Sequence, residues 1–365
     1  MREHCHFENA ARPAAISFLS AIIEYSGMSP VSSHNEGIVV DTAALRDEFA
    51  ALGSACGVYD LSSRSKIALH GSDRVRWLNG MVTNNVRDLA PGHGLYAFLL
   101  NPQGHIQGDL YAYNRGDSIT VDIEQSQAPQ ILALFDRYII MDDVEVAPLG
   151  DLAAIGVTGP KARAILATAG IEVPELHPLQ FIEAKWNGIS VTIVRADNPS
   201  VASYEVWLPV ENAPALAESL HKAGATPVSP AALELLRIAS GIPRYGQDIR
   251  ERDLPQETEQ ARALHFSKGC YIGQEIVERI RSRGNVHRKF TGFEIPGELP
   301  ALGAKVQLDG KDIGEITSTA SLPLDASTRP VALGYIRREA GAPGKQVRIG
   351  GTEATVADLP FQNIF

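Results

Sequence analysis

The chain has 365 residues, a length that predicts two or three domains, because single hydrophobic cores stop growing at about 250–300 residues. Its composition is that of a globular protein, with 44% hydrophobic and 21% charged residues. The formal net charge of −10 argues against a protein that coats nucleic acid or an anionic membrane, but it leaves room for a local basic patch.

Cysteine content and hydropathy narrow the class of protein further. The cysteines are Cys5, Cys56 and Cys270, an odd number with no C-x-x-C pair. We therefore expect neither a disulfide framework nor a self-contained metal site, and we expect a reducing compartment, the cytoplasm. No apolar stretch reaches the roughly 18 residues that indicate a membrane span, so no membrane contact is expected.

The N-terminal half begins with an extension and continues into a regular pattern. Residues 1–40 are interpreted as a short helix or a loosely ordered segment, and 41–148 as a first α+β module. Leu45, Phe49 and Leu52 recur at the spacing of one helical face. The rest of this module is predicted to form strands at 66–71, 94–101, 108–114 and 118–123, and helices at 72–86, capped by Ser72, and 128–138.

A second module, residues 149–236, repeats the order of the first. Both open with a strand, a glycine and a helix, in "ALHGSDRVRWL" and "GVTGPKARAIL". Strict strand–helix alternation is missing, which favours two related α+β modules with mostly antiparallel sheets over a doubly wound parallel sheet. A helix capped by Ser229 and ended by Gly241 comes next, and residues 237–285 are expected to return to the first module.

The last part of the chain, residues 286–365, differs in character from the rest. Short β-rich segments are separated by glycine and proline, and helical periodicity is missing. This pattern predicts a small C-terminal β-barrel or sandwich.

The stretch "HFSKGCYIGQEIVERIRSRG" contains the first candidate for chemistry, Cys270. A helix is predicted from Gly273, with Glu275 and Arg279 paired four residues apart. Cys270 would then precede a helix N-terminus, where the helix dipole and Lys268 both favour a thiolate. The alternative is a buried cysteine that packs as a small hydrophobe.

Basic residues follow the cysteine in a run that includes Arg279, Arg281 and Arg283. Such a run is able to hold a polyanion, such as a polyglutamate tail, a phosphate or RNA. A solvated helix end is the alternative explanation.

Asp109 is the second candidate, because it follows a glycine-rich turn and begins a strand. A carboxylate there is suited to bind a ligand amine or to act as a base, and a turn-capping aspartate is the alternative. Neither His93 nor His105 has the spacing of a metal ligand, and the chain contains neither a phosphate-binding loop nor a dinucleotide fingerprint.

The octapeptide "KGCYIGQE" at residues 268–275 resembles the signature of the YgfZ-type folate-binding proteins, a branch of the glycine-cleavage T-protein (aminomethyltransferase) superfamily. Further segments resemble that superfamily in the same order along the chain. They are "GVYDLSSRSKIALHGSDRVRWLNGMVTNNV", "LLNPQGHIQGDLYAY", "DRYIIMDDVEV", "LRIASGIPRYGQDI", "LPQE", "PVALGYIRR" and "LPF". The similarity extends from about residue 41 to residue 365.

This resemblance implies a fold in which two α+β modules and a β-barrel pack as a ring around a central folate cavity. It implies tetrahydrofolate, or a one-carbon derivative of it, as the ligand. Matching the segments places four residues where relatives meet the folate: Asp109, Glu205, Arg237 and Tyr271. It also implies that Asp109, Lys268 and Cys270 take part in the chemistry.

The resemblance also bears on activity. Aminomethyltransferases typically carry two adjacent acids in the glycine-rich segment, where this chain has Gly108 and Asp109. This difference and the cysteine signature imply a factor that assists assembly or repair of iron–sulfur clusters in client enzymes, including tRNA-modifying ones. The alternative is a folate-dependent aminomethyltransferase or methyltransferase. An RNA contact through Arg279, Arg281 and Arg283 is a third possibility.

Overall fold

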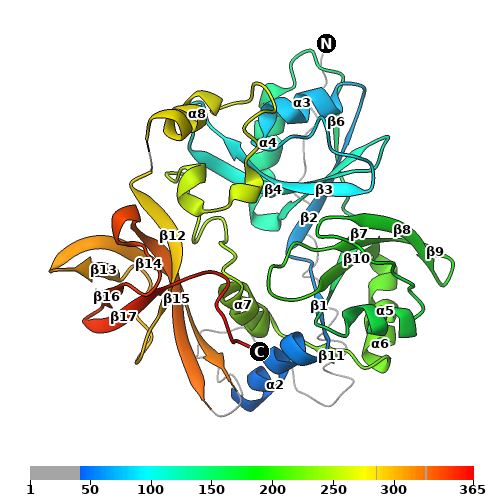
Figure 1. Ribbon diagram of the computed structural model, residues 1–365. Helices are drawn as coiled ribbons and strands as arrows, with labels where there is room; N and C mark the ends of the chain where they lie inside the picture. Colours follow the sequence, from blue (N-terminus) through cyan, green and yellow to red (C-terminus); the bar gives the residue numbers. More distant parts are fainter. Residues whose placement is uncertain (1–41, 285, 325–326) are drawn as a thin grey trace.

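The computed structural model describes residues 42–284, 286–324 and 327–365. These residues form two α+β units and a closed barrel, which lie around a common centre (Figure 1). The predicted fold class, α+β with mostly antiparallel sheets and a C-terminal barrel, is therefore confirmed. The predicted N-terminal extension, residues 1–40, lies outside the described residues.

The first module is built on a five-stranded antiparallel sheet with the order β3-β4-β5-β2-β6. Its strands are β2 (Arg64–His70), β3 (His93–Leu100), β4 (Ile106–Asn114), β5 (Ile119–Glu124) and β6 (Glu145–Pro148). Helices α3 (Arg74–Met81) and α4 (Ala128–Tyr138) belong to the same unit. Because side chains alternate across a strand, one face of the sheet is apolar and forms a core with these helices, in which Ile67, Val121 and Phe135 are buried.

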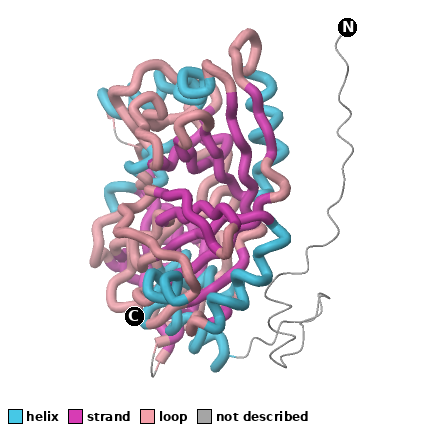
Figure 2. Tube along the Cα trace, turned by 90° about the vertical axis from the view of Figure 1, so that its right-hand side faces the viewer, coloured by secondary structure: helices cyan, strands magenta, loops and turns pink. Residues whose placement is uncertain are grey.

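The second module contains a six-stranded sheet with the order β11-β1-β7-β10-β9-β8. Its strands are β1 (Gly57–Asp60), β7 (Leu152–Thr158), β8 (Phe181–Trp186), β9 (Ile189–Arg195), β10 (Ser203–Pro209) and β11 (Thr226–Pro227). Helices α5 (Ala162–Thr168) and α6 (Ala213–Lys222) pack on its apolar face around Ile155, Val206 and Leu216. In the view turned by 90°, helices line one outer side and strands occupy the middle of the molecule (Figure 2).

Strand β1 crosses the predicted boundary between the modules. It lies within residues 41–148, yet it pairs with β7 through Gly57↔Thr158 and with β11 through Gly57↔Thr226. The chain then passes directly into β2 of the other sheet. The two modules therefore share one continuous stretch of backbone at their junction.

Two helices connect the modules to the barrel. Helix α2 (Thr42–Ser54) and helix α7 (Pro230–Ala239) form a core with the barrel, in which Phe49, Leu236 and Phe290 are buried. The predicted cap of α7 is confirmed, because Ser229 Oγ accepts a hydrogen bond from the backbone N–H of Ala232.

The C-terminal domain is a closed barrel with the strand order β12-β15-β14-β13-β16-β17. Its strands are β12 (Arg288–Glu294), β13 (Lys305–Leu308), β14 (Lys311–Pro323), β15 (Thr328–Arg337), β16 (Gln346–Ile349) and β17 (Thr352–Ala357). The barrel is filled by its own apolar side chains, among them Phe293, Ile316 and Ile336. Helix α8 (Gln274–Arg283) precedes it and lies over the first module (Figure 1).

The helix predicted over residues 72–86 is wrong at both ends, since α3 covers only Arg74–Met81. Ser72 does not cap it; its hydroxyl donates to Asp143 Oδ2 at 2.8 Å. At the other end, the N–H of Thr83 donates to the carbonyl of Phe98, which pulls the chain alongside β3. A long-range backbone contact therefore ends the helix early.

Candidate functional site

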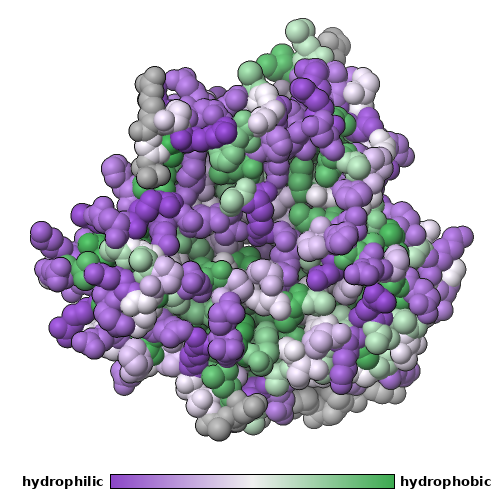
Figure 3. Space-filling view, in the orientation of Figure 1, coloured by the Kyte–Doolittle hydropathy of each residue, from purple (hydrophilic) through white to green (hydrophobic). Residues whose placement is uncertain are grey.

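A cavity of about 290 Å³ lies between the two sheets and the end of α7. Three residues predicted from the resemblance line it together: Asp109, Glu205 and Arg237. Five tyrosines contribute to its wall, namely Tyr59, Tyr96, Tyr111, Tyr113 and Tyr245. On the face shown in Figure 3, hydrophobic residues come to the surface near the middle, where the three units meet, while the barrel side is largely hydrophilic.

The two-residue period of the strands explains why these side chains converge. On β4, Leu110 and Ala112 enter the apolar core of the first module. Asp109, Tyr111 and Tyr113 therefore lie on the opposite face of the strand, and all three line the cavity. Each sheet thus turns one apolar face to its own helices, and the opposite faces meet through the apolar cluster of Tyr113, Phe181 and Trp207 beside the polar residues of the cavity.

Asp109 is held by two donors that are not among the predicted site residues. Gln127 Nε2 donates to Oδ1 and the Tyr96 hydroxyl donates to Oδ2, each at 2.7 Å. Burial, and then the Asp109 charge, raise the pKa of the Tyr96 phenol well above its usual value, so this hydroxyl stays protonated and donates. Arg262 lies 4.6 Å from the centre of the Tyr96 ring and closes this side of the cavity.

Glu205 enters the cavity from β10 beside a tryptophan. The indole N–H of Trp207 donates to Glu205 Oε2 at 2.8 Å, and Oε1 accepts no hydrogen bond from the described residues. Lys66 Nζ lies 4.8 Å from the Trp207 ring centre and 3.0 Å from Asp122 Oδ1. Lys66 and Asp122 of the first sheet therefore support the Trp207 ring, which in turn orients Glu205.

Arg64 is a further charged residue of the cavity wall that was not predicted. Its Nε lies 3.0 Å from both carboxylate oxygens of Asp122, and Nη1 donates to Glu124 at 3.2 Å. Its guanidinium carbon lies 5.5 Å from the centre of the Tyr111 ring. The direct pairing of Arg64 with Glu124 across β2 and β5 is a cross-strand signal, but it requires the strand register to be known.

Arg237 lines the cavity, but protein groups use all its donors. Nε and Nη2 donate to the two oxygens of Glu234 at 2.9 and 2.7 Å. Nη1 donates to Asp248 Oδ2 at 2.7 Å and to the carbonyl of Ile242 at 2.6 Å, while Nη2 also reaches Ser318 Oγ at 2.8 Å. An arginine at a cavity wall is suited either to hold a ligand carboxylate or to orient protein groups, and these contacts favour the second role for Arg237.

The signature segment lies outside this cavity, whose lining includes none of Lys268, Cys270 and Tyr271. Cys270 is exposed, which contradicts the alternative that it packs as a buried hydrophobe. It precedes α8, which begins at Gln274, and Gly269 and Gly273 on either side adopt φ values of +94° and +82°. Tyr271 packs at the edge of the buried cluster that contains Tyr96.

Lys268 is only 4% exposed, and its ammonium group faces away from solvent. Nζ donates to the carbonyls of Asn79 and Val82 at the end of α3 and lies 4.8 Å from the centre of the Tyr271 ring. Burial, and then the charge of Arg87, lower its pKa to about 7. Lys268 therefore anchors the loop to α3, and the expectation that it favours a Cys270 thiolate stays a prediction.

Arg279 and Arg281 of the basic run on α8 are exposed but partly neutralised. Arg279 pairs with Glu275 at 3.1 Å, as predicted, and Arg281 pairs with Glu278 at 3.5 Å. The Arg281 guanidinium also lies 4.5 Å from the centre of the Phe266 ring. The RNA contact through this run and Arg283 stays a prediction.

Within the residues that the structure describes, no three His, Cys, Asp or Glu side chains are grouped so as to hold a metal ion. His93 Nδ1 donates a hydrogen bond to the carbonyl of Pro91 at 3.1 Å, and His93 Nε2 accepts one from Gln180 Nε2 at 2.9 Å. No helix in this part of the chain is long and apolar enough to span a membrane.

Comparison with known proteins finds relatives that match most of this chain. Residues 23–268 match the family model described as the GCVT N-terminal domain. The aminomethyltransferase of Rubrobacter xylanophilus is 29% identical over 328 residues, covering 88% of this chain and 87% of its own. That of Bacillus subtilis is 27% identical over 336 residues, covering 88% and 92%.

The fold is similar to that of the glycine cleavage system aminomethyltransferase T from Bartonella henselae. The TM-score is 0.83 with 24% sequence identity, over 94% of this chain and 96% of the other. The similarity therefore covers both modules and the barrel.

Proposed function

Because the chain belongs to the GCVT family, we propose that its central cavity binds tetrahydrofolate and that the protein transfers a one-carbon unit to or from it. The observation that carries this proposal is the convergence of Asp109 and Glu205 on one cavity with tyrosine walls. Relatives named aminomethyltransferase match almost the whole chain, which supports a transferase of that type.

The chemistry of the cavity fits a reduced folate. A pterin presents a row of N–H donors along one edge, and carboxylates accept such donors in short, charge-assisted hydrogen bonds. Aromatic side chains provide flat apolar surface for the ring system. Arg244 and Arg262 also line the cavity; each pairs with one acid, Glu234 and Asp197, and keeps further N–H donors that suit the carboxylates of the glutamate portion.

The residues of the chain then have distinct roles. Bound tetrahydrofolate supplies the nitrogen atoms that carry the one-carbon unit. Asp109 has one hydrogen bond on each oxygen, so each oxygen retains a lone pair for an N–H group or a proton from a substrate amine. Tyr96 and Gln127 fix the plane of that carboxylate, and Glu205 offers Oε1 as a second acceptor.

Two measurements test the proposal. Calorimetric titration with tetrahydrofolate is expected to show one site, and Asp109→Asn and Glu205→Gln should each weaken binding about tenfold or more, since each removes a charged acceptor. Asp136→Asn, on the exposed side of α4, is the matched control. Wild-type affinity in both cavity variants would refute the proposal.

The second measurement is formation of methylene-tetrahydrofolate from an aminomethylated lipoyl carrier protein. Turnover that requires Asp109 but not Cys270 is expected of an aminomethyltransferase. Folate binding without turnover would restrict the proposal to a binding function.

Assistance to iron–sulfur clusters, as in the YgfZ-type branch, is a second candidate function. The exposure of Cys270 on an anchored loop favours it. A cluster usually takes four ligands, so one thiolate would act only together with an assembly factor or client enzyme. Cys270→Ala should then keep folate binding but fail to restore cluster-enzyme activity in a deletion strain, with Cys56→Ala as control. Full restoration would exclude this function.

A further inference from the structure

Tyr59 on β1 packs over a glycine of the neighbouring strand. The register pairs Tyr59 directly with Gly156 of β7, and Gly156 in turn with Glu205 of β10, so these residues form one row across the second sheet. Tyr59 and Glu205 both line the central cavity. Ile155 and Val157, on either side of the glycine, enter the apolar core on the opposite face. A side chain in place of the glycine would therefore point toward the cavity.

No side chain fits at Gly156 while the tyrosine ring is in place. A Cβ built there would lie 2.7 Å from Tyr59 Cδ2 and closer still to Cε2 and Cζ, well inside the distance at which two carbon atoms touch. The Tyr59 hydroxyl forms a 2.9 Å hydrogen bond with Thr158 Oγ1, two residues farther along β7. The glycine thus provides the space, and Thr158 the polar partner, that keep the ring against the sheet.

The phenol of Tyr59 lies close enough to Glu205 to respond to its charge. Burial is the main cause that raises the pKa of this phenol to about 12; the hydrogen bond with Thr158 opposes the rise, and the negative charge of Glu205 adds to it. The phenol therefore stays neutral at physiological pH. Tyr59 and Glu205 together present a ring and a carboxylate, side by side, to the cavity.

The first sheet contains the same pairing in a different setting. Gly94 of β3 lies opposite Tyr113 of β4, and a Cβ on Gly94 would lie 2.5 Å from Tyr113 Cδ1. Tyr113, however, is only 2% exposed, because Phe181 and Trp207 pack edge-to-face against its ring. Gly94 therefore serves the packing of a buried ring, whereas Gly156 sets the position of Tyr59, a partly exposed ring that borders the cavity.

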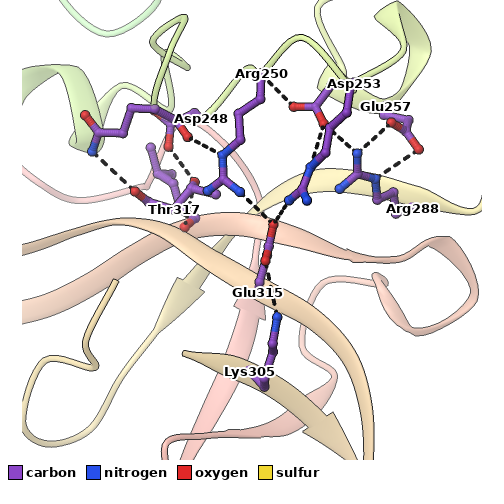
Figure 4. A network of polar contacts seen from close by, with 11 residues as sticks. Asp248, Arg250, Asp253, Glu257, Arg288, Lys305, Glu315 and Thr317 are labelled. Atoms are coloured by element: carbon purple, nitrogen blue, oxygen red, sulfur yellow. Dashed lines mark hydrogen bonds and ion pairs between the residues drawn. The ribbon is translucent and has the colours of Figure 1, made fainter. Parts of the chain in front are cut away.

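Another wall of the cavity is tied to the barrel and does not yield to a displaced ring. Residues 242–245 line the cavity, and the chain continues from them into Asp248, which accepts a hydrogen bond from Thr317 of β14 (Figure 4). Arg250 then pairs with Glu315 of the same strand at 3.0 Å. Because these contacts fix the segment, a tyrosine ring lifted from β7 would take up space inside the cavity.

We propose that Gly156 determines the specificity of the central cavity, because its lack of a side chain lets Tyr59 lie back against the sheet and leaves the space beside Glu205 free for a flat ring with N–H donors. Such a ring packs against Tyr59 while its N–H groups donate to Glu205 Oε1, which accepts no hydrogen bond from the described residues. This inference rests on the proposed function, in which the flat ring is the pterin of tetrahydrofolate.

A double-mutant cycle tests the proposal through the tetrahydrofolate affinity of the full chain, measured by calorimetry. Gly156→Ala should bind about tenfold or more weakly, since its Cβ lifts the tyrosine ring into the cavity. In a Tyr59→Ala background the same change should have almost no effect, because no ring remains to be lifted. Gly80→Ala, whose Cβ on α3 meets open space, is the matched control. Wild-type affinity in Gly156→Ala, or equal losses in both backgrounds, would overturn the proposal.

Thr158→Val provides a test that does not depend on tolerance of an added Cβ. This change keeps the volume of the side chain but removes the only hydrogen bond of the Tyr59 hydroxyl among the described residues. The ring is then held less firmly, and tetrahydrofolate should bind several-fold more weakly. A urea midpoint near that of the wild type verifies the fold of each variant, and wild-type affinity in Thr158→Val would count against the proposal.

Fluorine NMR of protein labelled with meta-fluorotyrosine separates this proposal from the function on which it rests. The signal that is missing in Tyr59→Phe belongs to Tyr59, and without any ligand it should shift in Gly156→Ala but not in Gly80→Ala. An unchanged signal would refute the displacement of the ring, whatever the affinity for folate. A shifted signal in a protein that does not bind tetrahydrofolate would refute the proposed function and still support the control of the ring by Gly156.

Discussion

The Tyr96 hydroxyl donates a 2.7 Å hydrogen bond to Asp109 Oδ2 from the strand adjacent to that of the carboxylate. This contact fixes Asp109 from within the sheet, independently of any ligand. Replacing Tyr96 with Phe should therefore reduce tetrahydrofolate affinity, by about tenfold for the loss of one hydrogen bond to a charged group. Titration of the variant measures the effect.

A matched control for this prediction is Tyr138→Phe, which removes a tyrosine hydroxyl outside the cavity. A circular dichroism spectrum like that of the wild type verifies the fold of both variants. Equal affinity in Tyr96→Phe and Tyr138→Phe would show that the contact does not position Asp109 for the ligand.

The buried Lys268 predicts a pH dependence of stability. Its folded-state pKa of about 7 lies below the ordinary value of 10.5, so between these values the unfolded chain binds more protons than the folded one. Stability should therefore rise with pH over this window, by at most about 1.4 kcal/mol per pH unit. Urea unfolding of the wild type and of Lys268→Met from pH 7 to pH 10 measures this difference, and a constant difference would contradict it.

The two described cysteines should differ sharply in reactivity. Cys56 is buried, and burial raises its pKa to about 12, whereas Cys270 is exposed. In a Cys5→Ser background, a thiol reagent at pH 8 should modify Cys270 rapidly and Cys56 only after unfolding. Mass spectrometry of the labelled peptides identifies the site, and early labelling at Cys56 would contradict the expectation.

The glycines that flank the Cys270 loop should respond unequally to alanine. A Cβ on Gly269 meets open space, so only its left-handed conformation opposes the change, by about 1–2 kcal/mol. A Cβ on Gly273 would lie 2.7 Å from the carbonyl oxygen of Asn101 and 2.9 Å from Leu100 Cβ, which adds about 1–3 kcal/mol of overpacking. Urea unfolding should rank Gly273→Ala as the less stable variant.

Local patterns predicted most of the secondary structure. The helix capped by Ser229 and the ion pair of Glu275 with Arg279 are confirmed because both depend on residues within one turn of each other. The early end of α3 was missed because Thr83 bonds to Phe98, a partner that sequence periodicity does not reveal. The position of β1 was missed for the same reason.

The site was predicted in part. The resemblance selected Asp109 and Glu205, which line one cavity, but their assignment to folate stays a prediction. Once the register of β3 with β4 is known, Tyr96 can be identified, since it alternates with the core residues Leu95 and Ala97 and lies on the face shared with Asp109. The pairing of Arg237 with Glu234 lies within one turn of α7 and was predictable from their spacing, whereas its pairing with Asp248 and the inward turn of Lys268 arise from tertiary contacts.

The shared strand β1 limits how this fold can be divided into parts. A fragment that ends at Pro148 would carry β1 without either of its neighbours, β7 and β11, and a fragment that begins at residue 149 would lack the strand between them. A chimera in which one module is replaced by that of a relative is therefore expected to fold only with a breakpoint between Asp60 and Arg64. There the backbone leaves the second sheet, at the end of β1, and enters the first sheet, at the start of β2. The sheet of the second module thus depends on a strand that is encoded with the first module, so the two are expected to be exchanged together.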